Sequence, residues 1–274
     1  MIHRSGSKAG FGTCALVFFA GIAGNNVLPL RAGDVMRAFS YPGHLDASPA
    51  FLLGTIVLER ALDLLAVLTL AVIVTFAADV ALPYPGLLRI VAFLLVLGVF
   101  AIVAVLTFAA TIERWALRLC SMIFSSPKLR ERVSCHIRSF LEIFAQTGPA
   151  AIARLSALSL GAWVFEGTVF VSIAAALDLR LPLVAPWIAF VLATFVAMVP
   201  SAPGYVGTFD MAVMAALVSS GTSTDSAAAF ALLVHATLWV SVTLAGAISF
   251  FILQRIPPKN KLSPPTVAFT EVRE

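Results

Sequence analysis

Long apolar stretches alternate with short polar connections along the whole chain. These stretches are residues 10–30, 51–78, 87–110, 155–177, 183–199, 209–220 and 227–253. A membrane-spanning helix needs roughly 20 apolar residues. Five stretches reach that length, the first only just, whereas residues 183–199 and 209–220 are shorter. The pattern predicts an all-α polytopic integral membrane protein with about six to seven membrane segments, two of them interrupted or re-entrant.

Composition supports this class of protein. Of 274 residues, 60% are hydrophobic and 12% are charged, with a mean hydropathy of +1.00, whereas soluble domains carry roughly 25% charged residues. We expect a short N-terminal segment over residues 1–9, a helical membrane domain over residues 10–253 and a polar tail over residues 254–274. Three cysteines without a C-x-x-C pair indicate neither a disulfide framework nor a metal site. We expect no metal, no cofactor and no nucleic-acid partner.

Basic residues are unevenly divided among the connections. Residues 31–50, 111–150 and 254–274 hold two, six and four Lys or Arg residues, whereas residues 79–86 and 200–226 hold none and residues 178–182 hold only Arg180. Short loops rich in Lys and Arg stay on the cytoplasmic side. The count therefore predicts a multi-pass protein of the cell inner (plasma) membrane. Residues 31–50, 111–150 and 254–274, and so the C-terminus, are expected on its cytoplasmic side.

The N-terminal end does not fit this alternation. If residues 10–30 cross the membrane fully into a cytoplasmic loop, Arg4 and Lys8 lie outside, against the trend. Either residues 10–30 enter and return as a re-entrant loop, or a preceding helix is missing from the sequence. Of the two, we favour the missing helix.

Residues 111–150 are amphipathic. Ile137, Phe140, Leu141 and Phe144 recur at helical spacing beside Arg138. One interpretation is a cytoplasmic connection with an interfacial helix that lies on the anionic inner leaflet. The other is a solvated cytoplasmic hairpin, and the sequence does not separate the two.

The second apolar stretch contains a charged turn. Glu59 and Asp63 are one helical turn apart and share a face, and Arg60 is three residues from Asp63. At the bilayer centre each charge costs about 2.5–3.5 kcal/mol, so we expect the turn to lie near the cytoplasmic interface and to face a protein-lined or watery cavity. It forms a lipid-headgroup site, an ion-pair contact with Arg31 or Arg37, or both.

Two Pro/Gly-containing segments interrupt apolar stretches, "GNNVLPLRAGDVMRAF" and "VPSAPGYVGTFDMAV". Irregular backbone at membrane depth occurs where it is buried in protein or lines a cavity, and paired interruptions are typical of a transporter-like binding site. We expect the backbone to break at Pro29, Gly33, Pro203, Gly204 and Gly207. The predicted headgroup site comprises Asn25, Asn26, Arg31, Asp34, Arg37, Glu59, Arg60, Asp63 and Asp210.

Two further polar residues lie inside apolar stretches and are secondary candidates. Glu166 has no basic residue within one turn, and His235 lies in the last stretch. A buried carboxylate of this kind needs a hydrogen-bond donor or a proton. His235 suits a packing role better than a proton relay.

The motifs "NNVLPLRAGDVMRAF", "TIVLERALDLLAV" and "PSAPGYVGTFDMAVMAALVSSG" resemble the lysylphosphatidylglycerol synthase transmembrane-region family. The resemblance covers nearly the whole chain. It implies a flippase-like membrane domain, since better-known members carry aminoacyl-phospholipid across the membrane. The family more often has Glu where this chain has Asp34 and Asp210, and it usually begins with an additional helix. Because only about twenty residues follow Leu253, we expect this chain to lack the soluble aminoacyl-transferase domain of bifunctional relatives.

The combined interpretation is a lipid-handling protein, a flippase or translocator of a phospholipid, aminoacyl-lipid or glycolipid. We expect a transporter rather than an enzyme, with no catalytic residues, because no H-E-x-x-H motif or Gly-rich phosphate loop is present. The alternative is a membrane-embedded transferase, or an accessory subunit that partners a separate lipid-modifying enzyme or glycosyltransferase. Sequence alone indicates neither the headgroup, the direction of transport nor the oligomeric state.

Overall fold

The computed structural model describes residues 9–77, 85–199 and 202–258, which are helical and contain no strand. This confirms the predicted all-α membrane class. The elements are α1 (Phe11–Val27), η2 (Pro29–Arg31), α2 (Ala32–Phe39), α3 (Pro42–Leu45), α4 (Pro49–Ala77), α5 (Pro85–Ile123), α6 (Pro127–Gln146), α7 (Pro149–Ala176), α8 (Val184–Met198), η3 (Pro203–Tyr205), α9 (Thr208–Ser219) and α10 (Thr224–Arg255).

Local sequence signals set most helix starts. Proline is the first residue of α4, α5, α6 and α7, a position where its missing N–H is not needed and its fixed φ suits the helix. Ser48 accepts a hydrogen bond from the Phe51 amide at 3.2 Å, and Ser223 accepts one from the Ser226 amide at 3.3 Å. These side chains satisfy amides that lack intrahelical partners at the starts of α4 and α10.

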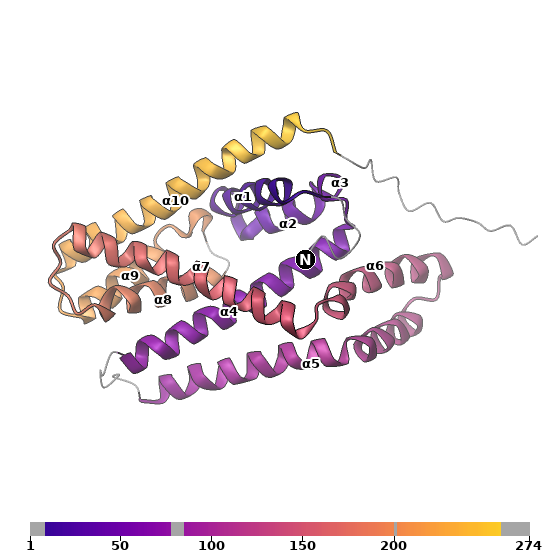
Figure 1. Cartoon of the computed structure of the whole chain (residues 1–274), viewed down its shortest axis with the longest axis horizontal. Helices are drawn as coiled ribbons and strands as arrows, with labels where there is room; N and C mark the ends of the chain where they lie inside the picture. Colours follow the sequence, from indigo (N-terminus) through magenta and orange to yellow (C-terminus); the bar gives the residue numbers. More distant parts are fainter. Residues whose placement is uncertain (1–8, 78–84, 200–201, 259–274) are drawn as a thin grey trace, which may run out of the picture.

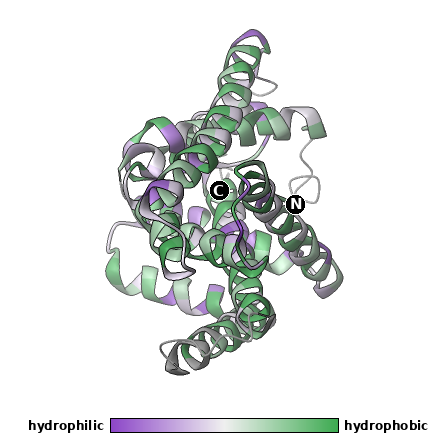
Figure 2. Ribbon diagram, turned by 90° about the vertical axis from the view of Figure 1, so that its left-hand side faces the viewer, coloured by the Kyte–Doolittle hydropathy of each residue, from purple (hydrophilic) through white to green (hydrophobic). Residues whose placement is uncertain are grey.

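Three of the described helices, α5, α7 and α10, are long and apolar enough to cross a membrane. α4 is as long as α7 but carries the charged turn at Glu59–Asp63. Hydrophobic residues cover most of the ribbon (Figure 2), and on α5 the side chains of Phe93, Val96 and Phe100 are 65%, 67% and 69% exposed. An exposed apolar face of this size is typical of a surface that contacts lipid.

α1 and α2 form a helical hairpin around η2. Gly33 in α2 lies against α1 so closely that a Cβ at Gly33 would be 1.9 Å from the Gly21 carbonyl oxygen, which is the small-residue contact that lets membrane helices pack closely. Both ends of the hairpin lie near the C-terminal end of α10, where His44 in α3 is 3.0 Å from the Ile256 carbonyl oxygen. α1 is only about 25 Å long at 1.5 Å per residue, less than the hydrocarbon core.

A fold-back of this kind is what the re-entrant alternative for the first apolar stretch requires. The preference for a missing helix rested on a full crossing of residues 10–30, and the fold-back at η2 removes that basis. Arg31 and Arg37 consequently lie within the hairpin and not in a cytoplasmic loop. The predicted orientation of the chain therefore rests on the basic residues of α6 and of the tail.

α8 and α9 form a second hairpin around η3, and it enters from the opposite end of the molecule. α8 runs from the left-hand end in Figure 1 towards the centre, and α9 returns to that end before the turn into α10. The chain between Met198 and Thr208 is not a continuous helix: Val199, Ala202 and Val206 are extended, and Gly204 and Gly207 have positive φ. The two hairpins thus point at each other.

Two apolar cores surround these hairpins. One is built mainly by α7, α8, α9 and α10 around Phe170, Phe190 and Phe230, and the other by α1, α2, α4 and α6 around Leu58 and Ile143. The aromatic rings of Phe170 and Phe190 meet edge to face at 5.3 Å, an orientation that aromatic pairs favour. The charged turn of α4 and the two hairpin tips lie between the two cores.

The structure of residues 111–150 differs from the single amphipathic connection that the sequence predicts. α5 continues through the expected boundary to Ile123, with non-helical backbone angles at Phe108 (φ −103°, ψ 15°), so the expected end is a kink. α6 then packs along α4, where Ile143 and Phe144 are buried. Of the apolar face that we predicted, Phe144 is therefore buried against protein, whereas Ile137, Phe140 and Leu141 line an apolar pocket.

Candidate functional site

The tips of the two hairpins meet. The Arg31 guanidinium donates a hydrogen bond of 2.6 Å from Nη2 to the Ala197 carbonyl oxygen at the end of α8, and it lies 6.0 Å from the ring centroid of Tyr205 in η3. From α10, the Trp239 indole N–H donates to the Asn26 carbonyl oxygen at 3.4 Å. Two interruptions that are far apart in sequence thus form one junction.

Both tips hold backbone in unusual conformations. Leu30 and Arg31 have φ of 56° and 54°, and Tyr205 has φ of 59°. Positive φ is uncommon for residues with a side chain, and such strain concentrates at functional sites. Gly204 (φ 62°) also has no room for a side chain, because a Cβ there would lie 2.6 Å from Trp239 Nε1. The predicted breaks at Pro29, Pro203, Gly204 and Gly207 fall in the tips, whereas the break predicted at Gly33 is wrong, because Gly33 lies inside α2 and the irregular backbone is at Leu30 and Arg31.

Five of the predicted residues form a chain of ion pairs beside the junction. Arg37 donates hydrogen bonds of 3.1 and 2.8 Å to the two carboxylate oxygens of Glu59 and lies 3.5 Å from Asp34. Arg60 pairs with Glu59 and, at 3.5 Å, with Asp63. These side chains are only 12–35% exposed. Three carboxylates and two guanidinium groups leave the chain one negative charge.

Arg31 does not join this chain. We expected its charge to balance the cluster, but it contacts α8 and η3 instead. The reason is the left-handed backbone at Leu30 and Arg31, which re-aims the side chain at the start of α2. The positive charge of Arg31 is therefore separate from the ion-pair chain, whose net charge is negative.

Neighbouring polar side chains fix the orientation of the site. Asp63 accepts hydrogen bonds from Ser159 at 2.7 Å and from the Trp163 indole at 3.2 Å, both in α7. The Asn25 side-chain oxygen accepts from the Asp34 amide at 3.0 Å, and the Asn26 amide donates to Thr243 at 3.0 Å. The two asparagines thus hold the hairpin together and tie it to α10.

Ser159, Trp163, Tyr205, Trp239 and Thr243 were not among the predicted site residues. Tyr205 lies within the second Pro/Gly segment, between Gly204 and Gly207, whereas the other four lie in α7 and α10 and no local sequence signal marks them. Only the register between remote helices brings them there.

Two arginines at the site retain unused donors. Within the described residues, Arg31 Nε and Arg60 Nε are buried and have no hydrogen-bond partner. Buried polar groups are normally paired, and a charged group left without a partner is costly. These N–H groups are therefore available to an acceptor such as a phosphate oxygen.

Asp210 and His235 make a second pair. His235 Nδ1 is 2.8 Å from Asp210 Oδ1, and His235 Nε2 is 2.8 Å from the Gly204 carbonyl oxygen. The other Asp210 oxygen accepts a hydrogen bond of 2.9 Å from the Gly207 amide. Asp210 thus belongs to the tip of the second hairpin and not to the ion-pair chain. His235, which we expected to pack, contacts a carboxylate and a backbone carbonyl.

Glu166 makes none of these contacts, although it lies in α7 with Ser159 and Trp163 and interacts electrostatically with Asp63. It is half-buried in α7, and no side chain in the described part of the chain is hydrogen-bonded to it. The described residues also contain no group of three His, Cys, Asp or Glu side chains that could hold a metal ion. We assign Glu166 no role in the site.

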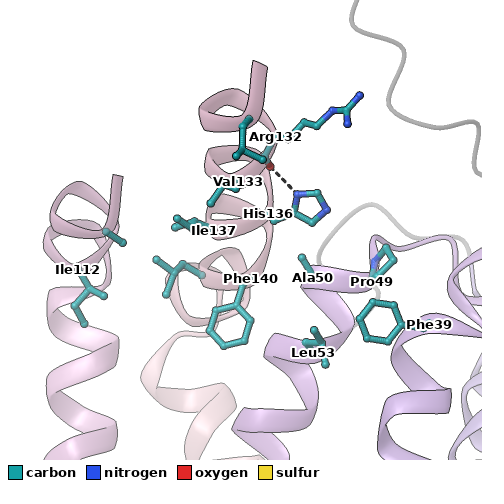
Figure 3. Close-up of a pocket in the computed structure, with 13 residues that line it drawn as sticks. Phe39, Pro49, Ala50, Leu53, Ile112, Arg132, Val133, His136, Ile137 and Phe140 are labelled. Atoms are coloured by element: carbon teal, nitrogen blue, oxygen red, sulfur yellow. Dashed lines mark hydrogen bonds between the residues drawn. The ribbon is translucent and has the colours of Figure 1, made fainter. Parts of the chain in front are cut away.

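An apolar pocket of about 750 Å³ opens next to the end of α2. Figure 3 shows that Ala50 and Leu53 of α4, Phe140 of α6 and Phe39 of α2 face it, with Arg132 and His136 at one rim. Its remaining lining is also mainly apolar and comes from α4, α5 and α6. Phe39 follows Arg37 by two residues in α2, so the two side chains lie on different faces of this helix.

Comparison with known proteins places the chain in a family. The family model for the lysylphosphatidylglycerol synthase transmembrane region matches residues 1–246. The chain is 23% identical over 243 residues to the UPF0104 membrane protein MJ1078 of Methanocaldococcus jannaschii, covering 86% of this chain and 98% of that protein.

The chain is also 29% identical over 269 residues to the glycosyltransferase AglD of Haloferax volcanii, covering 88% of this chain but only 43% of AglD. No solved structure matches it. The matched model extends over both hairpins and the charged turn between them, so the chain belongs to the lysylphosphatidylglycerol synthase transmembrane-region family.

Proposed function

We propose that this protein translocates a membrane lipid whose headgroup carries a phosphate. The observation that carries the proposal is Arg31 at the junction of the two hairpin tips, with a buried Nε that has no partner. A guanidinium binds phosphate through charge-assisted hydrogen bonds. Opposed broken segments that meet within a membrane domain are typical of transporter sites.

The ion-pair chain favours a headgroup that also carries an amine. It has a net charge of −1 and lies beside Arg31 but separate from it. A zwitterionic or aminoacylated headgroup carries both a phosphate and an ammonium, so it has one group for each of the two charged parts of the site. Asp34 and Asp63 are the carboxylates at the two ends of the chain, and either would meet the ammonium.

The apolar pocket beside α2 suits an acyl chain. Its lining from α4, α5 and α6 is mainly apolar, and Arg132 and His136 lie at its rim. With α6 and the tail on the cytoplasmic side of the plasma membrane, as their basic residues favour, the pocket opens at the cytoplasmic end of the protein. A lipid of the inner leaflet would then enter there.

The test is lipid movement in proteoliposomes. Wild-type protein and Arg31→Ala are compared with fluorescent-tailed phosphatidylglycerol and its lysyl derivative, by the fraction of label quenched from outside over time. We expect Arg31→Ala to abolish movement while gel filtration shows folded protein. Arg138→Ala is the matched control, since Arg138 is 67% exposed and pairs only with Glu113, at 3.5 Å. Normal movement by Arg31→Ala would contradict the proposal.

A second candidate function rests on the likeness to AglD. AglD is described as a glycosyltransferase, and the match covers 43% of it. In this alternative the chain presents a glycan-carrying or polyprenyl-phosphate lipid to a separately encoded transferase. Arg31 would still bind the phosphate. Co-purification of a transferase, with lipid movement absent from proteoliposomes of the chain alone, would favour this alternative.

A further inference from the structure

The Asp210–His235 pair lies at the second hairpin tip, away from the ion-pair chain. His235 comes from α10, Asp210 from the first turn of α9 and Gly204 from η3. The side chains of His235 and Asp210 are 14% and 26% exposed. The Phe209 ring lies 4.9 Å from the imidazole, so the pair is largely screened from solvent on this side.

The contacts of the imidazole define how many protons the pair holds. A carbonyl oxygen only accepts hydrogen bonds, so Nε2, at 2.8 Å from Gly204 O, carries a hydrogen. Nδ1 faces Asp210 Oδ1 at 2.8 Å. Between these two atoms there must also be one proton, either on Nδ1 as an imidazolium or on Asp210 as a carboxylic acid. Without it, two lone pairs would face each other.

We propose that Asp210 and His235 form a proton-binding site whose occupancy holds the second hairpin tip on α10, and that this proton is coupled to lipid translocation. The coupling of this proton to translocation rests on the proposed function, whereas the proton-binding site does not. When the proton leaves, the neutral imidazole has a single N–H for two acceptors, so either the Asp210 contact or the Gly204 contact is lost and the hold of α10 on the tip weakens.

The tip that this proton holds also reaches the headgroup site. Asp210 caps the Gly207 amide with its second oxygen at 2.9 Å, and Tyr205, next to Gly204, lies under the Arg31 guanidinium. Release of the tip from α10 would therefore move one wall of the phosphate site. Protonation of the pair and binding of the headgroup thus both depend on the backbone position of the second hairpin tip.

Other ionisable groups on the surrounding elements are few. They are Tyr205 in η3, Arg31 in η2, Arg154 and Glu166 in α7, and Asp225 and Arg255 near the two ends of α10, while α8 has none and α1 has only Cys14 near its start. Within the described residues, none of these is hydrogen-bonded to Asp210 or His235. The side-chain hydrogen bonds of the pair are therefore made to each other and to the backbone of the second hairpin tip.

The proton site is tested by spectroscopy. Histidine labelled with a magnetic nitrogen isotope is observed in lipid nanodiscs between about pH 5 and about pH 8, and His235→Gln identifies the signal of His235. Infrared spectra, with Asp210→Asn as reference, report the protonated carboxyl group. We expect the pair to lose one proton across this range. A pair whose protonation does not change would overturn the site.

The coupling is tested by lipid movement under a pH gradient. Fluorescent-tailed phosphatidylglycerol and its lysyl derivative serve as probes in the proteoliposomes. We expect a gradient of one sign to accelerate wild-type movement and the opposite sign to slow it. Asp210→Asn and His235→Gln should lose this dependence, and Asp210→Glu should retain it. The matched control is His44→Gln, because His44 also contacts a carbonyl, that of Ile256 at 3.0 Å, without a carboxylate partner.

The outcomes separate the two proposals. Wild-type movement that ignores the gradient overturns the coupling and leaves the proposed function intact. Absence of any lipid movement by the wild type overturns the proposed function, and with it the coupling, whatever the spectra show. Loss of gradient dependence in His44→Gln would show a nonspecific effect of histidine removal and would also overturn the coupling.

Discussion

The guanidinium of Arg31 donates a 2.6 Å hydrogen bond to the carbonyl oxygen of Ala197, across 166 residues of sequence. This bond joins the tip of the first hairpin to the end of α8. Ala197 is in the last turn of its helix, where carbonyl groups lack intrahelical donors. Arg31 therefore completes a broken helix end and at the same time keeps an unused N–H.

The first prediction concerns the shape of this cation. Arg31→Lys keeps the charge but cannot contact Ala197, Tyr205 and a phosphate together, because an ammonium lacks the planar fork of a guanidinium. Loss of one charge-assisted hydrogen bond is worth about 1.5 kcal/mol, so we expect lipid movement to slow about tenfold. The rate in proteoliposomes measures it, with Arg138→Lys as control. A Lys variant as fast as wild type would argue against bidentate binding.

The second prediction concerns the Arg37–Glu59 pair. Glu59→Gln leaves two guanidinium groups, Arg37 and Arg60, without their shared carboxylate. Breaking a fully buried pair costs about 3–5 kcal/mol, and this pair keeps partial exposure, so we expect a loss of about 2 kcal/mol in the free energy of unfolding. Equilibrium unfolding in mixed micelles measures it.

A double variant controls for the role of charge. Arg37→Met with Glu59→Met removes both partners, so it should be less destabilising than the two single changes added together. The exposed Arg138–Glu113 pair provides the contrast, since removal of Arg138 should change stability by less than about 1 kcal/mol. Strict additivity of the two methionine changes would mean that the pair has no coupling energy.

The third prediction concerns the close approach within the first hairpin. A Cβ at Gly33 would lie 1.9 Å from the Gly21 carbonyl oxygen and 2.5 Å from the Asn25 amide nitrogen, both backbone atoms. Gly33→Ala must therefore open the hairpin and should prevent recovery of folded protein or lower its thermal midpoint markedly. Gly161→Ala, at a helical site with nothing within 4 Å of the added Cβ, should be neutral or stabilising. Equal midpoints for the two variants would contradict the packing described.

The fourth prediction separates strain from crowding at the second tip. Gly204 and Gly207 have φ of 62° and 84°, but only Gly204 meets neighbours, with Trp239 Nε1 at 2.6 Å from an added Cβ. Gly207→Ala should cost about 1–2 kcal/mol from backbone strain alone, and Gly204→Ala should cost more. Unfolding measurements compare the two. A larger loss for Gly207→Ala would reverse this assignment.

Sequence reasoning reached the helices and their interruptions because those signals are local. Apolar length and the Pro/Gly breaks at Pro29 and at residues 203–207 can be recognised from the local sequence, whereas Gly33, which was also predicted as a break, lies inside α2. The spacing of Glu59 and Asp63 likewise predicts a shared face, because positions i and i+4 are neighbours on any helix.

Contacts between remote helices were beyond the same reasoning. The separation of Arg31 from the other charges follows from left-handed backbone at Leu30 and Arg31, which no residue type there indicates. The bonds from Ser159 and Trp163 to Asp63 depend on the register of α7 against α4. His235 and Asp210 come together only because α9 folds back along α10.

The last prediction concerns orientation in the membrane. The starts of α1 and α4 lie at the same end of the molecule as the end of α10. The turn between α5 and α6 also lies at this end, because Leu129 at the start of α6 and Pro49 at the start of α4 line one pocket. The turn between α9 and α10 lies at the opposite end (Figure 1). The basic residues of α6 favour the first end as cytoplasmic.

Cysteine labelling in intact cells tests both the hairpin and its orientation. Cys14, Cys120 and Cys135 are first changed to Ala, and single cysteines are placed at Gly10, Ser48, Ser126 and Thr224. Gly10 tolerates a side chain, since nothing lies within 4 Å of an added Cβ. We expect a membrane-impermeant maleimide to label Thr224 from outside, and the other three only after permeabilisation. If Gly10 is labelled from outside while Ser48 is not, α1 crosses the membrane fully and the first hairpin is not re-entrant.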